Sequence, residues 1–292
     1  MTGKKVLAIS LILLGLGLLS SLAWEKVFKG QKTLAINPEG IPGYDYPLLK
    51  PGEFQQEVGQ HRHFYRDAGM DRELVRTLNR SVFEAICHDD GNQITLGENW
   101  IQYVAGWFYS PLRRPQLPFE IEVRGAGICS EACTVLQAHL AEAGISSRFV
   151  GLSGHVVLEA EADGQWIYLD PDFGVSAPVS ADQMVQAAAE DQPRWQQLRA
   201  KLSQLGFSPE TIANYRHCLA TEEDNVTLPV NQPLSPRLYW FAWFTVRVSP
   251  LVALVFVWLG IRIVIPRRVA PRVKQGLANG RSRPSQDGEF AR

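Results

Sequence analysis

The chain has 292 residues, of which 46% are hydrophobic and 20% are charged, a composition that fits one globular domain with extra segments and excludes collagen-like, coiled-coil and fully disordered chains. Its 29 basic residues nearly balance its 30 acidic residues, for a formal net charge of -1, so no nucleic-acid partner is expected. Four cysteines are too few for a small domain that depends on disulfides.

The N-terminal region predicts a membrane span. Residues 6–23 carry no charge and follow Lys4 and Lys5. A helix over this stretch would be about 27 Å long, close to the ~30 Å hydrocarbon core of a bilayer. We therefore expect a transmembrane helix or signal anchor over residues 6–24, after a cytoplasmic segment 1–5. A cleavable signal peptide is the alternative, because Ser21 and Ala23 are small residues of the kind that a signal peptidase reads.

An irregular lead-in is expected over residues 25–70, because its middle is crowded with glycine and proline. From residue 71 onward, apolar residues recur every three or four positions and predict an amphipathic helix over 71–87. Trp100, Val104 and Trp107 have the spacing of a second helix, which Pro111 ends.

The following stretch predicts one more helix, a small sheet and further helices. The helix runs from Cys129 to Gly144, a residue suited to the left-handed position after a helix end. Strands are expected at 147–152, 155–161 and 165–169, with a hairpin turn at 162–164, and helices at 180–190, 193–206 and 208–218. Helices followed by an antiparallel sheet predict an α+β domain over residues 71–220, which a proline-containing linker over 221–238 follows.

A second membrane span is expected over residues 239–265. Its uncharged run, 248–261, lies between Arg247 and Arg262, and aromatic residues precede it. A buried core helix is the alternative, but seven basic residues follow in the tail 266–292. By the positive-inside rule both termini are then cytoplasmic, which places the intervening domain in the periplasm or on the outer face of the inner (plasma) membrane.

Three residues have the types and spacing of a nucleophile, a base and an orienting acid. Cys129 begins a helix after a glycine-containing stretch, and the partial positive charge of a helix N-terminus favours a thiolate. His155 opens one strand and Asp170 follows the next. Because a tight hairpin joins these strands, His155 and Asp170 can pair, as in acyl-transfer enzymes.

Residues 125–174 resemble the core of the transglutaminase-like superfamily of papain-like cysteine enzymes. The matching motifs are Gly127-Ile128-Cys129, Gly144-Ile145-Ser146-Ser147-Arg148, His155, Gly164-Gln165-Trp166 and Asp170-Pro171. The family usually has an aromatic residue two positions after the histidine, where this chain has Val157.

The resemblance implies a papain-like, transglutaminase-like fold and a catalytic triad of Cys129, His155 and Asp170. The expected activity is cleavage or exchange of an amide or peptide bond in a protein or peptide substrate, through a thioester at Cys129. Water would make the protein a protease or amidase, and an amine would make it an acyltransferase. Both outcomes stay open, and no cofactor is expected.

Other readings of these residues remain. The same cleft could belong to a non-catalytic module that binds a peptide or glycopeptide, with proteins of envelope-polymer assembly as partners. A redox pair of Cys129 and Cys133 is disfavoured by their spacing, and Cys133 is expected in the core. A metal site with His139 lacks a tight ligand pair. Trp107 and Trp166 are expected to be packing residues.

One disulfide is predicted. Cys87 and Cys218 lie near the ends of the first and last helices of the domain, and the two ends of a compact domain often meet. An oxidising periplasm would allow them to pair. Two buried thiols at helix ends are the alternative.

Overall fold

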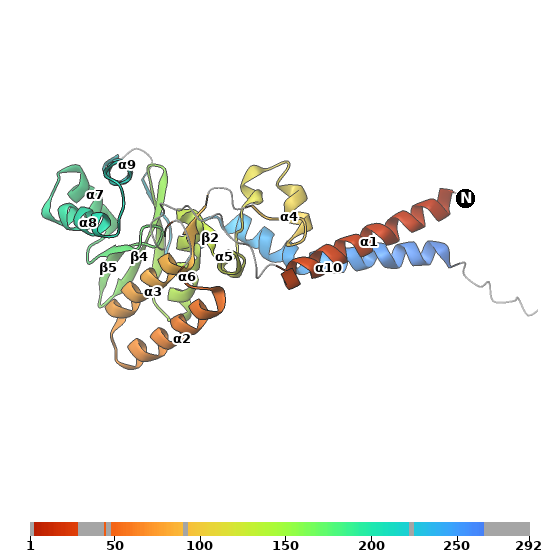
Figure 1. Cartoon of the computed structure of the whole chain (residues 1–292), viewed down its shortest axis with the longest axis horizontal. Coiled ribbons are helices and arrows are strands. Elements are labelled where there is room, and N and C mark those ends of the chain that lie inside the picture. The colour runs from red at the N-terminus through yellow and green to blue at the C-terminus, as the bar shows by residue number, and fades with distance from the viewer. Residues whose placement is uncertain (1–2, 29–43, 45–47, 90–92, 222–224, 266–292) are drawn as a thin grey trace, which may run out of the picture.

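The computed structural model describes residues 3–28, 44, 48–89, 93–221 and 225–265. It consists of a rounded body that contains the sheet and a rod of two long helices that projects from it (Figure 1). The expected basic tail at 266–292 and a large part of the lead-in lie outside the described residues.

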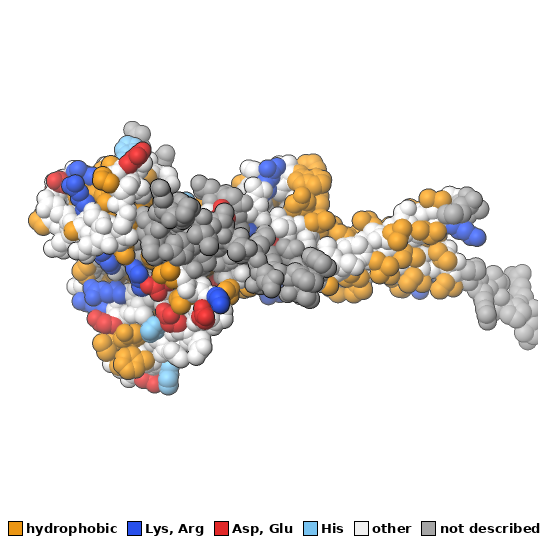
Figure 2. Space-filling view, in the orientation of Figure 1, with side chains coloured by type: hydrophobic (Ala, Val, Ile, Leu, Met, Phe, Trp, Pro, Cys, Tyr) orange, Lys and Arg blue, Asp and Glu red, His pale blue; other side chains and the backbone are white. Residues whose placement is uncertain are grey.

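The rod is formed by α1 (Gly3–Phe28) and α10 (Pro236–Val264). Both helices are long and apolar enough to cross a membrane, as expected for residues 6–24 and 239–265. The first turn of α1 and the last turn of α10 lie together at the end of the rod farthest from the body (Figure 1). Hydrophobic side chains cover much of the visible surface of the rod (Figure 2).

Two glycines let the helices of the rod approach closely. A methyl group on Gly15 would lie 2.6 Å from the carbonyl oxygen of Ala253, and one on Gly260 would lie 2.7 Å from that of Ala8. Small residues at such crossings allow backbone contact between apolar helices. These two contacts also fix an antiparallel register.

The body is built around an antiparallel sheet of five strands in the order β6-β5-β4-β3-β7. The strands are β3 (Ser147–Leu152), β4 (His155–Ala162), β5 (Gln165–Asp170), β6 (Val175–Ala177) and β7 (Val226–Thr227). The turn between β4 and β5 has positive φ angles at Asp163 and Gly164, as the tight hairpin turn requires. The three predicted strands are confirmed to within one residue at each end.

Helices cover both faces of the sheet. One hydrophobic cluster joins the sheet to α2 (Pro51–Asp67), α3 (Asp71–Ala85) and α6 (Cys129–Glu142). Another joins it to α7 (Ala181–Ala189), α8 (Pro193–Gln204) and α9 (Pro209–Ala220). Adjacent strand residues alternate between these clusters: Leu158 belongs to the first and Val157 to the second. The predicted α+β class is confirmed at this level.

Short elements connect α3 to α6. They are β1 (Cys87–His88), α4 (Trp100–Ala105), the 3-10 helix η2 (Ser110–Arg113), α5 (Pro118–Arg124) and β2 (Ala126–Gly127). β1 and β2 pair in parallel. The second predicted helix is shorter than expected, because it ends at Ala105 and Pro111 lies in the first turn of η2.

Two segments are more regular than predicted. The lead-in 25–70 contains α2, whose buried face consists of only Phe54 and Val58, so it has little apolar periodicity to reveal it. The linker 221–238 contains β7, which pairs with β3, and the first turn of α10. Both corrections arise because tertiary contacts, rather than local patterning, order these residues.

The predicted Cys87–Cys218 disulfide is wrong, because Cys218 is a free thiol on α9. Cys87 is buried in β1, where it pairs with Ala126. Helix α9, which carries Cys218, packs against α7 and α8.

Candidate active site

Cys129 is the first residue of α6 and is half-buried. The preceding Ile128 cannot cap the helix with its side chain, but its backbone N–H donates to the Glu131 carboxylate at 3.0 Å. Arg114 donates to both oxygens of that carboxylate, at 2.7 and 3.0 Å. A methyl group on Gly127 would lie 2.7 Å from Glu131 Oε2, so glycine is required there. These contacts fix the start of the helix and the position of Cys129.

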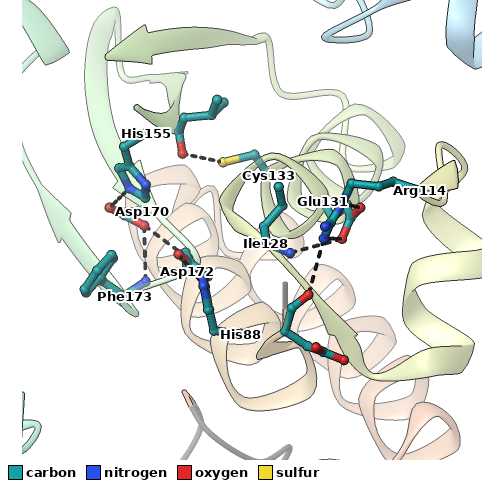
Figure 3. A network of polar contacts seen from close by, with 11 residues as sticks. His88, Arg114, Ile128, Glu131, Cys133, His155, Asp170, Asp172 and Phe173 are labelled. Atoms are coloured by element: carbon teal, nitrogen blue, oxygen red, sulfur yellow. Dashed lines mark hydrogen bonds and ion pairs between the residues drawn. The ribbon is translucent and has the colours of Figure 1, made fainter. Parts of the chain in front are cut away.

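His155 and Asp170 form the buried pair that the sequence predicts. His155 Nε2 donates to Asp170 Oδ2 at 2.7 Å, and the two side chains face each other across the end of the β4–β5 hairpin (Figure 3). His155 is 7% exposed and Asp170 is fully buried. Cys129 lies close enough to the imidazole to help raise its pKa. The structure therefore brings all three predicted site residues together, with Nδ1 as the ring nitrogen left to meet the thiol.

Asp170 is held by donors on the side away from His155. Its Oδ1 accepts the backbone N–H groups of Asp172 and Phe173, each at 3.1 Å. These bonds orient the carboxylate so that Oδ2 points at the imidazole (Figure 3). An acid fixed in this way holds the histidine in the tautomer that carries hydrogen on Nε2.

Two buried tyrosines extend this network. The hydroxyls of Tyr168 and Tyr215 lie 2.6 Å apart and share a hydrogen bond, and the negative charge of the nearby Asp170 acts on both phenols. Burial and the nearby Asp170 raise the pKa of both phenols well above 10, so both stay protonated.

Aromatic side chains enclose the histidine. The ring centroids of Phe173 and Tyr215 lie 5.5 and 5.6 Å from that of His155, and both pairs are T-shaped. Val157 is buried in the sheet. The aromatic surroundings of the imidazole thus come from the turn after β5 and from α9, rather than from the position two residues after the histidine.

The contribution of His155 to the stability of the fold is expected to depend on pH. Burial lowers its pKa, but Asp170 and Cys129 together outweigh this and raise the pKa well above 6.5. Protonated His155 therefore stabilises the folded state. This stabilisation is fully present below the ordinary histidine pKa and is lost as pH rises through the raised pKa of the folded state. We expect the melting-temperature gap between wild type and His155→Gln, in detergent micelles, to narrow as pH rises above 6.5. A gap that widens with pH would contradict this.

Cys133, one turn after Cys129, has the core role expected of it. It is fully buried, and its thiol donates to the Val156 carbonyl at 3.3 Å (Figure 3). Burial, followed by the negative charge of Asp170, raises the pKa of this thiol well above 9. Cys129 and Cys133 are both free thiols, but Cys129 is half-buried and Cys133 is fully buried, so the two occupy different environments.

A second histidine–carboxylate pair lies beside the first. His88 Nδ1 lies 3.0 Å from the buried carboxylate of Asp172 (Figure 3). The ring of Tyr44 stacks on that of His88, with the ring centroids 5.0 Å apart. The backbone N–H of Asp172 bonds to Asp170, so one turn connects the two pairs. The pairing of His88 could not be predicted from local patterns, because His88 precedes Asp172 by 84 residues. The only local signal was its place at the end of a predicted helix.

The other residues considered in the sequence analysis have different outcomes. His139 is buried and its Nε2 lies 2.9 Å from Glu122, and the described residues contain no group of three or more metal-ligating side chains. Trp166 packs under the guanidinium of Arg148, 4.2 Å from the ring centroid, as expected. Trp107 is 61% exposed, so its predicted packing role is wrong.

Comparison with known proteins gives no family assignment. No protein-family model matches the chain, and no curated protein sequence matches it. The resemblance to the transglutaminase-like superfamily therefore stays a prediction, which rests on the motifs of residues 125–174.

Proposed function

We propose that this chain is a membrane-anchored cysteine enzyme of the transglutaminase-like type that acts on an amide or peptide bond. The observation that carries the proposal is the buried hydrogen bond between His155 and Asp170, with Cys129 close enough to the imidazole to help raise its pKa. Nucleophile, base and orienting acid in this order are the elements of covalent acyl transfer.

The proposed acyl transfer uses the Cys129 sulfur and the His155 ring nitrogen Nδ1. The raised pKa of His155 favours transfer of the thiol proton to its Nδ1, and Cys129 Sγ then attacks the carbonyl carbon of the substrate. The C–N bond then breaks, the amine leaves with that proton, and the acyl group remains on sulfur as a thioester. Water or an amine next attacks the thioester and restores the thiol. The backbone N–H of Cys129, at the open end of α6, is a natural donor to the developing oxyanion.

The second candidate function is a binding module that uses the same cleft without forming a thioester. Cys129 and Cys218 provide an internal comparison, because both are half-buried free thiols of one chain. Of the two, Cys129 is the one that lies beside the buried imidazole of His155.

Alkylation distinguishes these functions. At pH 7 we expect a fluorescent iodoacetamide to label Cys129 roughly tenfold faster than Cys218, because His155 can take the proton of Cys129 as its sulfur reacts. His155→Gln should remove the difference and leave Cys218 labelling unchanged. Equal rates for the two thiols in wild type would favour the binding module.

For location, we propose that α1 and α10 both cross the inner membrane with the body outside the cytoplasm. The supporting observations are the length and apolar composition of the two helices, the common far end of the rod (Figure 1), and the basic residues next to both chain ends in sequence.

Reporter fusions test this orientation. We expect a reporter that is active only outside the cytoplasm to work after Gln232 and to fail after Gln275, a position outside the described residues. The reverse pattern would place the body in the cytoplasm.

A further inference from the structure

The segment from Trp100 to Arg113 is a hairpin of α4 and η2 with an exposed aromatic tip. Trp107, Phe108 and Tyr109 are 61%, 85% and 54% exposed. Hydrophobic side chains gather over the α4 region directly beside the rod (Figure 2). Contiguous exposed aromatic residues are uncommon on surfaces that face only water.

The base of this hairpin packs against α10 in the rod. The buried Asn99 donates from Nδ2 to Thr245 Oγ1 at 2.8 Å, and Trp100 Nε1 donates to the Ser249 carbonyl at 3.2 Å. The Trp100 ring also lies 6.4 Å from that of Phe256, centroid to centroid.

These contacts place the hairpin at the depth of the spans. The antiparallel register of the rod puts Ala23, where the apolar stretch of α1 ends, level with the turn of α10 that contains Thr245 and Ser249. Phe256 is seven residues further along α10, about 10 Å deeper at the rise of an α-helix. Trp100 therefore reaches below the level at which the α1 stretch ends.

The hairpin satisfies many of its own polar groups, as a membrane contact requires. The buried Gln102 donates from Nε2 to the carbonyls of Leu112 and Arg114, both at 3.1 Å. Arg113 Nε donates to the Gly106 carbonyl at 2.9 Å. The outward surface of the tip is left to tryptophan, phenylalanine and tyrosine, and tryptophan and tyrosine are the side chains enriched at membrane–water interfaces.

Two ion pairs connect the residues on either side of the hairpin to the end of α5 and the first turn of α6. Before the hairpin, Glu98 pairs with Arg124, and both side chains are less than 10% exposed. After it, Arg114 makes the two bonds to Glu131 that fix the first turn of the Cys129 helix. The hairpin is thus attached on both sides to the segments that flank Cys129.

We propose that the hairpin inserts its aromatic tip into the outer interface of the bilayer, as a third membrane contact that holds the Cys129 end of the body against the lipid surface. The inference rests on the proposed membrane span of α10. It does not depend on the proposed chemistry at Cys129, so the two can fail separately.

Site-directed spin labelling of the full chain in phosphatidylcholine–phosphatidylglycerol vesicles tests the insertion. The background is Cys129→Ala with Cys218→Ser, because the other two cysteines are buried. A nitroxide is attached at F108C, at L254C on α10 as a span control, and at F64C on α2 as a water control. Phe64 is 65% and Leu254 51% exposed, so neither label replaces a core side chain.

At F108C and L254C, we expect relaxation by oxygen, which enters the bilayer, to exceed relaxation by a water-soluble nickel complex several-fold, with the opposite order at F64C. An F108C label that is as nickel-accessible as F64C would overturn the proposal. A label shielded from both reagents would indicate a protein partner and would also overturn it. A label at L254C that is accessible to the nickel complex would overturn both the proposed membrane span of α10 and the proposed insertion of the hairpin. Phe108 supports little of the fold, and unchanged melting of F108C checks this.

Discussion

Replacing Cys129 with alanine will abolish acyl-enzyme formation and leave the body folded. Loss of the nucleophile removes the thioester route, and loss of the nucleophile in a serine-protease triad lowers turnover by about 10⁶-fold. The fold is expected to persist because Cys129 is half-buried at the first position of α6. The bonds of Glu131 that fix this turn do not involve the thiol. Acyl adducts in membranes and thermal melting measure the two effects.

Cys218→Ala is the matched control, since it removes a half-buried free thiol from α9. It should retain both adduct formation and activity. A melting temperature lowered by several degrees in Cys129→Ala would indicate a structural cysteine. Retained turnover in that variant would assign the chemistry elsewhere.

Asp170→Asn will lower turnover by about 10⁴-fold, the size of the corresponding effect in the serine-protease triad. The reason is the way the carboxylate is held. Oδ1 accepts two backbone N–H groups, so an asparagine must place its carbonyl oxygen there and its amide NH₂ toward His155. Nε2 would then have to accept, the ring hydrogen would move to Nδ1, and Nδ1 could no longer take the proton of Cys129.

Asp182→Asn is the control for Asp170→Asn, because Asp182 is an exposed aspartate in the first turn of α7. It should leave single-turnover rates unchanged. Wild-type rates in Asp170→Asn would remove Asp170 from the triad. Steady-state substrate affinity should change much less than the rate of thioester formation, because Asp170 is fully buried behind the imidazole.

Local patterns were sufficient to predict the centre of the body. The stripe that predicted α6, the Asp163–Gly164 turn and the alternation in β4 and β5 all describe contacts between residues close in sequence. Because His155 and Asp170 lie on one hairpin, their pairing could also be predicted. Gly144 has a φ of 74°, as expected for the residue after the end of α6.

The surroundings of the site depend on contacts that local patterns do not encode. Tyr215 reaches Asp170 from α9, and His88 reaches Asp172 from β1. Arg114 reaches Glu131 from the end of the hairpin. Each is a polar or aromatic residue without a motif of its own, and only the packing of separate elements determines its partner. The helix α2 was missed for a related reason, since only Phe54 and Val58 mark its buried face.

The most direct measurement of the proposed chemistry is the mass of the Cys129-containing peptide, isolated from membranes quenched rapidly in acid. The account predicts a wild-type peptide that carries an acyl group, is cleaved by hydroxylamine as a thioester, and yields a fragment that identifies the substrate. The adduct should be absent from Cys129→Ala and strongly reduced in Asp170→Asn. An unmodified Cys129 peptide, together with an intact peptide or glycopeptide that co-purifies with the chain, would contradict acyl transfer and favour the binding module.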